Sequence, residues 1–538
     1  MDMMKTFSKK NLAISADDIK SDLSTDFLSS EKLLKIKPAK VDSTDMNAYS
    51  NVMDRLRSTF SSGKTKDIKF RKKQLEAMLK MYEENRDEIC SVLDADLRRP
   101  KQEAIVFEID VMTNEILHLL AHMDEWSTPT KPTKGLANLF DEVLVYKEPY
   151  GVVLVIGAWN YPIQLSLVPM AAAIAAGNCV VLKPSEVSSH SEKFLIEKIP
   201  KYLDNDCYQV IAGGAEETTE LLRNQFDYIF YTGSGRVGQI VYTAATKYMT
   251  PVTLELGGKS PCYVDDSVDI GRSVRRILWG KNSNAGQTCI SPDYILCTKE
   301  VEKKLVEEFK AVIKEWYGDD VQKSPDYARI ATDGHFKRLT TFLTNGTIAA
   351  GGKYDPVDRF IEPTLLIDLN PSDPALQEEI FGPIMPIVTV NDVHDAIDYI
   401  NARDKPLSMY IFTNNTKDKS LMIASTSAGA ICVNDTVQHF ASNIPFGGVG
   451  PSGMGKYHGK NSFDTFTHEK GCLEKSINFF VEKLGDARYP PYSDWKESYL
   501  TSLMKFRNYW KVPYFSQIVM FCLGIAATVL YQKYGKSN

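Results

Sequence analysis

The stretch Gly151-Val152-Val153-Leu154-Val155-Ile156-Gly157 decides the fold of this chain. It is a continuous apolar run between two glycines, which is typical of a parallel strand buried on both faces. Alternating strands and helices over residues 150–265 predict an open, mostly parallel sheet with helices on both faces. The further elements that we expect there are a helix at Val168–Ala176 and strands at Cys179–Leu182, Tyr208–Ile211 and Tyr228–Thr232.

The rest of the chain extends this pattern in both directions. Apolar residues recur at helical spacing between residues 48 and 126, and the Pro/Thr/Lys-rich segment 127–135 indicates a linker before a short strand at Val143–Tyr146. Residues 265–425 repeat the alternation more loosely, with an amphipathic helix expected at Val301–Trp316. The following segment, 431–455, is irregular and rich in glycine.

Composition excludes several classes of function. The chain has 538 residues, 43% of them apolar and 25% charged, so two or three globular domains are expected. A net charge of −6 leaves no basic field for nucleic acid. The nine cysteines form no C-x-x-C pair and the eight histidines form no H-E-x-x-H, so the sequence predicts no metal site and a thiol-reducing compartment.

Two residues carry the chemistry that the sequence suggests. Cys289 follows Gly286-Gln287-Thr288, and Glu255 lies 34 positions earlier in Leu254-Glu255-Leu256-Gly257-Gly258-Lys259. A thiol that attacks a carbonyl and a carboxylate that activates water are the parts needed to oxidise an aldehyde covalently. The alternatives are an inert buried cysteine and a structural glutamate paired with a lysine.

Asn160 is the third candidate catalytic residue. It ends an apolar strand in Gly157-Ala158-Trp159-Asn160-Tyr161-Pro162, where its amide is placed to donate to an oxyanion. The alternative is an asparagine that only forms a turn.

A glycine-rich turn follows the strand Tyr228–Thr232. Gly233-Ser234-Gly235-Arg236-Val237-Gly238 spells G-x-G-x-x-G before a helical stretch, the context that a dinucleotide-binding turn requires. By this motif alone, Glu255 lies near the position of the ribose-binding acid, which conflicts with its role as a base.

Taken together, these segments resemble the aldehyde dehydrogenase superfamily, and look most similar to its class 3 and fatty aldehyde dehydrogenase branch. The resemblance runs from about Ser50 to His468. It rests on six motifs in order: Gly157–Pro162, Leu182-Lys183-Pro184-Ser185-Glu186, Leu254–Pro261, Gly286–Cys289, Glu378-Glu379-Ile380-Phe381-Gly382-Pro383 and Pro445-Phe446-Gly447-Gly448-Val449-Gly450.

The resemblance implies a role for each matching residue. Cys289 would be the nucleophile, Asn160 and the Cys289 backbone N–H the oxyanion hole, and Glu255 the base. The cofactor NAD, with NADP as the alternative, would be held by Lys183 and Glu186 at the adenosine ribose, Glu379 at the nicotinamide ribose and Phe381 beside the nicotinamide, together with Trp159, Gly233, Ser234 and Gly238. The turn at 233–238 contacts the cofactor in this family without being a standard fingerprint, which frees Glu255 for catalysis. Gly235 and Arg236 depart from the family pattern and leave the cofactor preference open.

The C-terminal segment predicts contact with a membrane. Val512 to Gln532 is 21 residues without a charge, with lysines on both sides, and is long enough for a spanning helix. The alternative is a buried core helix. Just before it, Trp495, Tyr499, Leu503, Phe506 and Trp510 fall near one helical face, which would lie on lipid or cap the substrate mouth.

The predicted fold is α/β of the aldehyde dehydrogenase type. It comprises a Rossmann-type cofactor domain, an α/β catalytic domain, a small β extension that pairs subunits into a homodimer, and a C-terminal membrane helix. The expected boundaries are 1–45 for a flexible extension without a signal peptide, 46–254 for the NAD(P)-binding domain with 128–148 in the β extension, 255–430 for the catalytic domain, 431–472 for a cleft-lining and oligomerisation segment, 473–511 for an amphipathic region and 512–532 for the membrane anchor.

The function predicted from these features is oxidation of long-chain fatty aldehydes to fatty acids at a membrane. The alternatives are oxidation of medium-chain or aromatic aldehydes by the same mechanism and, more distantly, a catalytically silent tethered scaffold. The enzyme is expected to face the cytosol, anchored in the mitochondrial outer membrane or the endoplasmic reticulum. A lipid droplet is the alternative for a segment that lies flat or forms a hairpin.

Overall fold

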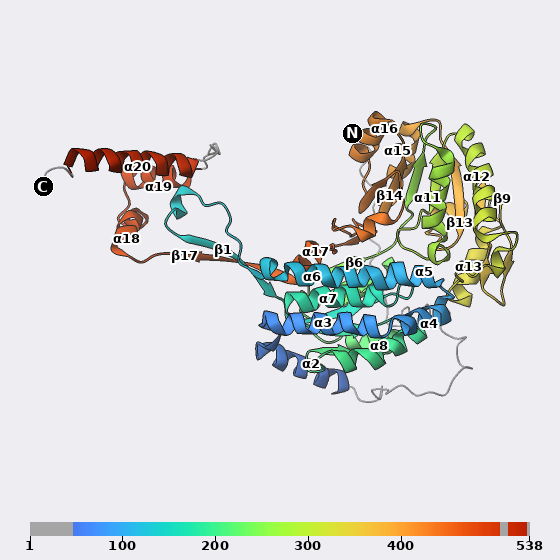
Figure 1. The fold of residues 1–538 in the computed structure, drawn as a ribbon, viewed down its shortest axis with the longest axis horizontal. Helices are drawn as coiled ribbons and strands as arrows, with labels where there is room; N and C mark the ends of the chain where they lie inside the picture. Colours follow the sequence, from blue (N-terminus) through green and yellow to red (C-terminus); the bar gives the residue numbers. More distant parts are fainter. Residues whose placement is uncertain (1–46, 506–514, 535–538) are drawn as a thin grey trace, which may run out of the picture. The chain divides into compact units, whose positions relative to one another are not determined.

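The structure, a computed structural model, describes residues 47–505 and 515–534 (Figure 1). The predicted N-terminal extension, 1–45, lies outside the described residues. Two compact units make up the chain: the first extends to Thr128 and resumes at Lys147–His468, and the second comprises Pro129–Tyr146 and the chain from Glu469 onward.

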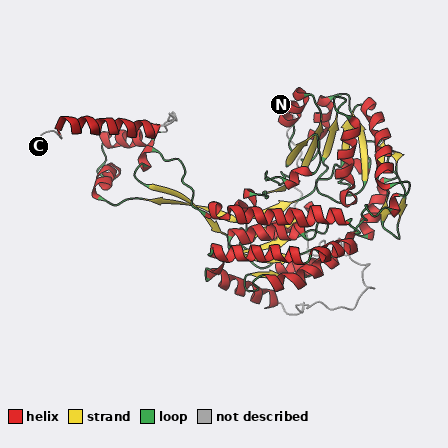
Figure 2. Ribbon diagram, viewed as in Figure 1, coloured by secondary structure: helices red, strands yellow, loops and turns green. Residues whose placement is uncertain are grey.

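A six-stranded sheet forms one half of the first unit (Figure 2). Its centre is β2 (Val152–Ile156), in which all five side chains are buried, as the apolar run predicts. Every pair is parallel except the edge pair β16–β6. The strand order is β16 (Gly453–Met454), β6 (Val252–Glu255), β5 (Tyr228–Thr232), β2, β3 (Cys179–Lys183) and β4 (Tyr208–Val210).

The register of this sheet brings polar side chains to one edge. Ile156 pairs with Lys183 and Tyr231, and Thr232 pairs with Glu255. The last residues of four parallel strands therefore lie within one residue of the same row. Ligands of open α/β sheets bind outside this carboxyl edge.

Helices cover the sheet, and α7 (Gln164–Ala176) is buried along its whole length. It packs against α3 (Ile68–Glu84) and α6 (Val111–Ser127), which run beside it in Figure 1. The other helices of this half are α2 (Asn47–Ser61), η1 (Lys64–Lys66), α4 (Arg86–Leu97), α5 (Lys101–Ala104), η2 (Ile105–Asp110), α8 (Ser189–Tyr202), α9 (Ala215–Leu221), α10 (Gly235–Thr246) and α17 (Lys460–Thr465).

A seven-stranded sheet forms the other half of the first unit. All its pairs are parallel except β9 with β12. The order is β15 (Ala430–Val433), β14 (Ser408–Phe412), β7 (Pro261–Val264), β8 (Tyr294–Cys297), β13 (Ile384–Thr389), β12 (Thr364–Ile367) and β9 (Thr347–Ala350). A separate hairpin pairs β10 (Tyr354–Asp355) with β11 (Phe360–Ile361).

Most helices of this half pack around a second core: α11 (Ile270–Asn282), η4 (Ser283–Gly286), α12 (Lys299–Tyr317), η5 (Val321–Lys323), α13 (Asp333–Phe342) and α14 (Pro374–Gln377). The helices α15 (Val393–Asn401) and α16 (Thr416–Ser425) pack in a third core, and η6 (Gln438–Ala441) contributes Phe440 to the first. The chain passes from the first sheet to the second between Glu255 and Pro261, beside the predicted boundary at residues 254/255.

The second unit contains most of the two-stranded sheet of β1 (Glu142–Pro149) and β17 (Thr467–Glu474). Within it, the ammonium of Lys475 lies 2.6 Å from the carboxylate of Asp141, which is buried. Its helices are η3 (Leu136–Asn138), α18 (Phe479–Gly485), η7 (Asp486–Arg488), α19 (Asp494–Met504) and α20 (Phe515–Tyr534).

The C-terminal predictions meet the structure only in part. Within the predicted amphipathic region 473–511, Trp495, Tyr499 and Leu503 lie on α19, which ends at Met504. Phe506 and Trp510 lie outside the described residues. Of the predicted anchor 512–532, residues 515–532 are helical and the first three lie outside the described residues. Among the described residues, no helix combines the length and the apolar character needed to cross a bilayer. The membrane helix therefore stays a prediction.

Candidate active site

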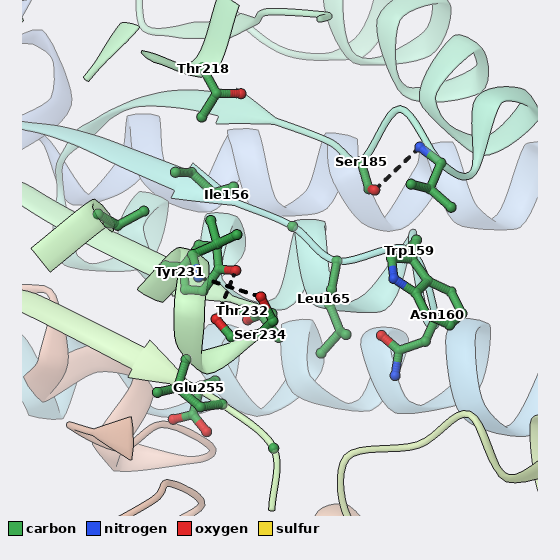
Figure 3. A pocket seen from close by; sticks show the side chains of 18 of the residues that line it. Ile156, Trp159, Asn160, Leu165, Ser185, Thr218, Tyr231, Thr232, Ser234 and Glu255 are labelled. Carbon is green, nitrogen blue, oxygen red and sulfur yellow. Dashed lines mark hydrogen bonds between the residues drawn. The ribbon is translucent and has the colours of Figure 1, made fainter. Parts of the chain in front are cut away.

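One cavity of about 550 Å³ in the first unit collects nearly all the residues that the sequence singled out. A volume of this size is ordinary for a cofactor or substrate site. Figure 3 shows Glu255 at the end of its strand and Asn160 beside Trp159 in the same pocket. The predicted residues in its lining are Cys289, Glu255, Asn160, Trp159, Lys183, Glu186, Gly233, Ser234, Glu379 and Phe381.

An unusual backbone presents Cys289 to this cavity. After α11, Asn284, Ala285 and Gly286 have φ values of 51°, 51° and 76°, all in the left-handed region. Only glycine adopts this region without strain, and a Cβ at position 286 would lie 2.3 Å from the carbonyl oxygen of Gly382. Three such residues in succession turn the chain sharply just before Cys289, which lines the cavity and is half-buried as a whole residue.

Gln287 fastens this turn, and the sequence analysis gave it no role. Its amide nitrogen donates to the carbonyls of Asn284 and Arg329, each at 2.9 Å. Its amide oxygen accepts from the N–H of Ala331 at 2.9 Å. Because the partners at 329 and 331 are distant in sequence, spacing alone offered no signal for this contact.

The thiol of Cys289 is poorly ionised in this setting. Burial is the main cause, and the carboxylates of Glu379 and Glu255 add to it, raising the pKa of Cys289 to about 12. The thiolate is the reactive form of cysteine. The cavity therefore keeps the nucleophile protonated until a base or a bound group favours the thiolate.

The carboxyl group of Glu255 is buried without a hydrogen-bond partner among the described residues. Its side chain is only 3% exposed, and neither oxygen has a hydrogen-bond partner among the described residues. Burial raises its pKa well above the usual range. A carboxyl with a raised pKa is suited to taking a proton from water near neutral pH, and the structural alternative, a pair with lysine, is absent among the described residues.

Asn160 is held at both ends. Its side-chain amide donates to the carbonyl of Gln287 at 3.1 Å, and its own carbonyl accepts from the side chain of Asn284 at 3.0 Å. An amide nitrogen has two hydrogens. One is used on the Cys289 loop, which leaves the other for an oxygen that develops charge in the cavity.

A buried ion pair supports Asn160 from behind. Arg99 donates to the carbonyl of Asn160 and to Glu108, and both charged side chains are fully buried. Glu108 in turn accepts from the backbone N–H groups of Ile163 and Gln164 at 3.1 and 2.7 Å, at the start of α7. No motif in the sequence indicates this pair, because its partners come from separate elements.

The other end of the cavity carries the residues expected to hold the adenosine half of a cofactor. Lys183 ends β3 and lies 2.6 Å from Glu186. Ser234 caps α10 by accepting from the N–H of Val237 at 3.4 Å, and a helix N-terminus of this kind favours phosphate. Gly238 does not line the cavity; an added Cβ there would lie 2.8 Å from the side chain of Leu256. Its role is close packing of helix on sheet.

The nicotinamide end is formed by the loop 379–381. The carboxylate of Glu379 fills the space that a side chain at Gly257 would need, since a Cβ there would lie 2.2 Å from it. Burial, with Asp293 as a second cause, raises the pKa of Glu379 to about 8. A dinucleotide fits this donor set: a lysine and a carboxylate at one end, a capped helix between, and a carboxylate with aromatic rings at the other.

A second cavity of about 420 Å³ is lined by the aromatic side chains of Phe107, Trp279, Trp316 and Tyr317 and by the carboxyl groups of Glu103 and Asp326. The ring of Phe107 lies 5.6 Å from Trp279 and 5.9 Å from Tyr161. The hydroxyl of Tyr161 is 2.8 Å from that of Thr288, the residue before Cys289. Phe107 and Tyr161 therefore connect this cavity to Thr288, which directly precedes Cys289.

Comparison with known proteins agrees with this arrangement. The model of the aldehyde dehydrogenase family matches residues 30–471. Aldehyde dehydrogenase family 3 member A2 of Rattus norvegicus is 49% identical over 448 residues, covering 83% of this chain and 92% of that protein. The dimeric NADP-preferring aldehyde dehydrogenase of Mus musculus is 48% identical over 447 residues, covering 83% and 98%.

A solved structure shares the fold over the same region. The substrate-bound state of Staphylococcus aureus AldH superimposes with a TM-score of 0.82 at 40% identity, covering 85% of this chain and 99% of that one.

Proposed function

Because the chain belongs to the aldehyde dehydrogenase family, as an NAD(P)-dependent enzyme of its class 3 branch, we propose that it oxidises long-chain aliphatic aldehydes through a covalent intermediate on Cys289. The observation that carries the mechanism is the single cavity lined by Cys289, Glu255 and Asn160. The unpartnered carboxyl of Glu255 is its most telling feature, because a buried group of this kind is costly unless it serves chemistry.

In the proposed mechanism the Cys289 thiol loses its proton to water in the cavity, the sulfur bonds to the aldehyde carbon, and the electron pair of the C=O π bond moves to the oxygen, which becomes an oxyanion. Asn160 and the backbone N–H of Cys289 donate to that oxygen; removing one such donor typically costs about 10²–10³ in rate. A bound nicotinamide supplies the acceptor for the hydride, which leaves a thioester on Cys289. Glu255 then takes a proton from water, whose oxygen attacks the thioester carbon; the C–S bond breaks and the carboxylic acid leaves.

The choice of a long-chain substrate rests on the apolar surfaces of the protein and on the resemblance to the fatty aldehyde branch. The second cavity offers aromatic walls to an alkyl chain. Each buried methylene contributes roughly 0.8 kcal/mol, which corresponds to an upper limit of about fourfold in kcat/KM per carbon. The same aromatic walls favour the second candidate, an enzyme for medium-chain or aromatic aldehydes.

We place the enzyme at a membrane through residues 512–532, facing the cytosol from the mitochondrial outer membrane, the endoplasmic reticulum or a lipid droplet. The proposal is supported by the uncharged sequence from Val512 to Gln532 and by exposed apolar side chains on α20. We also propose a homodimer formed through the segment that carries β1 and β17; the mouse relative named above is described as dimeric.

A substrate profile in detergent micelles tests the substrate class. Formation of NADH or NADPH is measured with hexanal, decanal, hexadecanal and benzaldehyde. We expect kcat/KM to rise along the aliphatic series and to exceed that for benzaldehyde, and Cys289→Ser to abolish turnover with all four. A preference for benzaldehyde or hexanal would favour the second candidate, and full activity of the serine variant would refute the mechanism.

A further inference from the structure

Two side chains of α13 hold the loop that carries Glu379 and Phe381. The guanidinium of Arg338 donates to the carbonyls of Glu379 at 3.1 Å and Ile380 at 2.6 Å. The Nε2 of His335 lies 2.7 Å from the carbonyl oxygen of Phe381. Three successive carbonyls of the loop are therefore held by one turn of a single helix.

The hydrogen bonds of His335 allow only one form of its ring. Arg338 Nη2 lies 3.3 Å from Nδ1, and a guanidinium only donates, so Nδ1 must accept. The proton is then on Nε2, which donates to the carbonyl of Phe381. Burial, followed by the charge of Arg338, lowers the pKa of His335 to about 4, so the ring stays neutral at physiological pH.

The same ring closes an aromatic triangle. The centroid of His335 lies 5.9 Å from that of Trp159 and 6.1 Å from that of Phe381, and those two lie 5.4 Å apart. All three pairs meet edge to face, an arrangement that aromatic rings prefer. Trp159 directly precedes Asn160, so the triangle joins the oxyanion side of the cavity to the nicotinamide side.

Phe381 needs this support because its backbone is strained. Its φ is +54°, in the left-handed region that a bulky residue rarely adopts. Such a conformation persists only where the surroundings over-determine it, and it concentrates at functional sites. Two kinds of contact hold Phe381 in this conformation. His335 donates a hydrogen bond to its carbonyl, and the rings of Trp159 and His335 pack against its side chain.

We propose that His335 is a positioning residue for hydride transfer, which holds the Phe381 loop and its ring in the one arrangement that seats the nicotinamide against the carbon bound to Cys289. This inference rests on the proposed function and extends it to a residue outside the family motifs that the sequence analysis matched. Arg338 supports this arrangement without contacting the nicotinamide: it donates to the carbonyls of Glu379 and Ile380 and fixes the tautomer of His335.

Two reactions of the same cavity should depend differently on His335, because only one of them needs the nicotinamide. Oxidation of an aldehyde needs the nicotinamide in place. Hydrolysis of 4-nitrophenyl acetate needs only the protein: the sulfur of Cys289 displaces 4-nitrophenolate, and water activated by Glu255 releases acetate from the thioester. A displacement of about 1 Å costs on the order of 10²-fold in a reaction that depends on alignment. Loss of His335 should therefore slow oxidation while leaving ester hydrolysis intact.

The experiment compares His335→Leu, His335→Gln and a matched surface control, His394→Leu, in the full-length protein. For His335→Leu we expect kcat for decanal to fall about 10²-fold and the deuterium isotope effect with [1-²H]decanal to increase. We expect ester hydrolysis without cofactor, and the dissociation constant for NADH measured by fluorescence, to stay within about threefold of wild type. His335→Gln keeps a donor for the Phe381 carbonyl and should recover most of the oxidation rate, and His394→Leu should match wild type in every assay.

Two outcomes would overturn the proposal. Equal loss of oxidation and ester hydrolysis in His335→Leu would show a general structural role, and unchanged oxidation would show that His335 positions nothing. Wild-type protein that hydrolyses the ester but oxidises none of the aldehydes would instead refute the proposed function, so the two failures are distinguishable.

Discussion

At the scale of single residues, the unpartnered carboxyl of Glu255 makes the sharpest prediction. Glu255→Gln keeps the shape of the side chain but removes the base, so the thioester should form once and then persist. We expect a burst of one NADH per active site, followed by steady-state turnover reduced about 10²–10⁴-fold. Stopped-flow absorbance measures both phases. Hydroxylamine, which attacks a thioester without a base, should restore turnover; a variant with normal steady-state rate would exclude Glu255 as the base.

Glu103 predicts a pH dependence of substrate binding. It lines the aromatic cavity and accepts from the N–H of Asn284 at 2.8 Å. Burial is the main cause that raises its pKa to about 7, while the N–H of Asn284 and then the charge of Arg99 lower it. The carboxyl is therefore neutral below pH 7 and ionised above, where an alkyl chain would have to desolvate a charge.

We expect the KM for decanal to rise between pH 6 and pH 8. The limit is about tenfold one pH unit above the pKa, reached if only the neutral form binds. Initial-rate measurements with saturating cofactor give the profile. Glu103→Gln should flatten it. A wild-type KM that is constant over this range would show that the chain does not contact this wall.

Arg99 predicts a coupled loss of stability and activity. Removing one partner of a buried ion pair typically costs about 3–5 kcal/mol, because the other charge stays buried. Arg99→Met should therefore lower the apparent Tm by roughly 5–10 °C. It should also lower kcat, because the carbonyl of Asn160 loses a donor. Differential scanning fluorimetry and steady-state rates measure the two effects; Arg99→Met with Glu108→Leu should recover part of the stability but not the rate.

At the scale of elements, the turn between α11 and Cys289 has the least freedom to change. Gly286→Ala would place a methyl group 2.3 Å from the carbonyl oxygen of Gly382 in a left-handed conformation. We expect a loss of more than about 1 kcal/mol in stability and on the order of 10²-fold in kcat. Urea titration and initial rates measure these losses.

Gly135→Ala is the matched control for this substitution. Apart from its chain neighbours, no atom of the described residues lies within 4 Å of an added Cβ at Gly135, which is not in the lining of the cavity. This variant should fold and turn over normally. An active Gly286→Ala enzyme would show that the turn tolerates a second conformation.

The elements also show how far sequence reasoning reaches. The strands at 152–156, 179–183 and 228–232 could be predicted because each is an apolar run between turn residues, and the parallel sheet follows from their spacing. The catalytic cavity could be predicted from motifs that lie at strand ends. The roles of three residues could not be predicted: Gln287, Arg99 and His335. Each donates to backbone carbonyl groups that only the tertiary fold brings near, and every residue has such a group, so the sequence does not indicate which one is the partner.

At the scale of the whole molecule, the C-terminal helix has exposed apolar side chains but does not meet the requirements of a membrane span. Helix α20 exposes Met520, Phe521, Leu523, Ile525 and Val529, each by 49% or more. Exposed apolar side chains in this number favour contact with lipid or protein over contact with water. None of the described helices, however, meets the combined length and apolarity of a membrane span. The proposed binding to lipid has two possible arrangements, across the bilayer or along its surface, and extraction distinguishes them.

We expect full-length protein to float with liposomes of phosphatidylcholine and phosphatidylethanolamine, and protein truncated after residue 488 to remain in solution. A spanning helix of about 20 residues resists washing at pH 11, whereas a helix that lies in the interface is released. Retention after the wash would support the predicted anchor at 512–532, and release would support surface binding.

With short aldehydes the truncated enzyme should keep its kcat, since the catalytic cavity lies within residues 156–381. With hexadecanal in liposomes it should lose most of its rate, because each methylene holds the substrate in lipid by about 0.8 kcal/mol. Equal loss for both substrates would mean that the C-terminal region supports the fold and does not deliver the substrate.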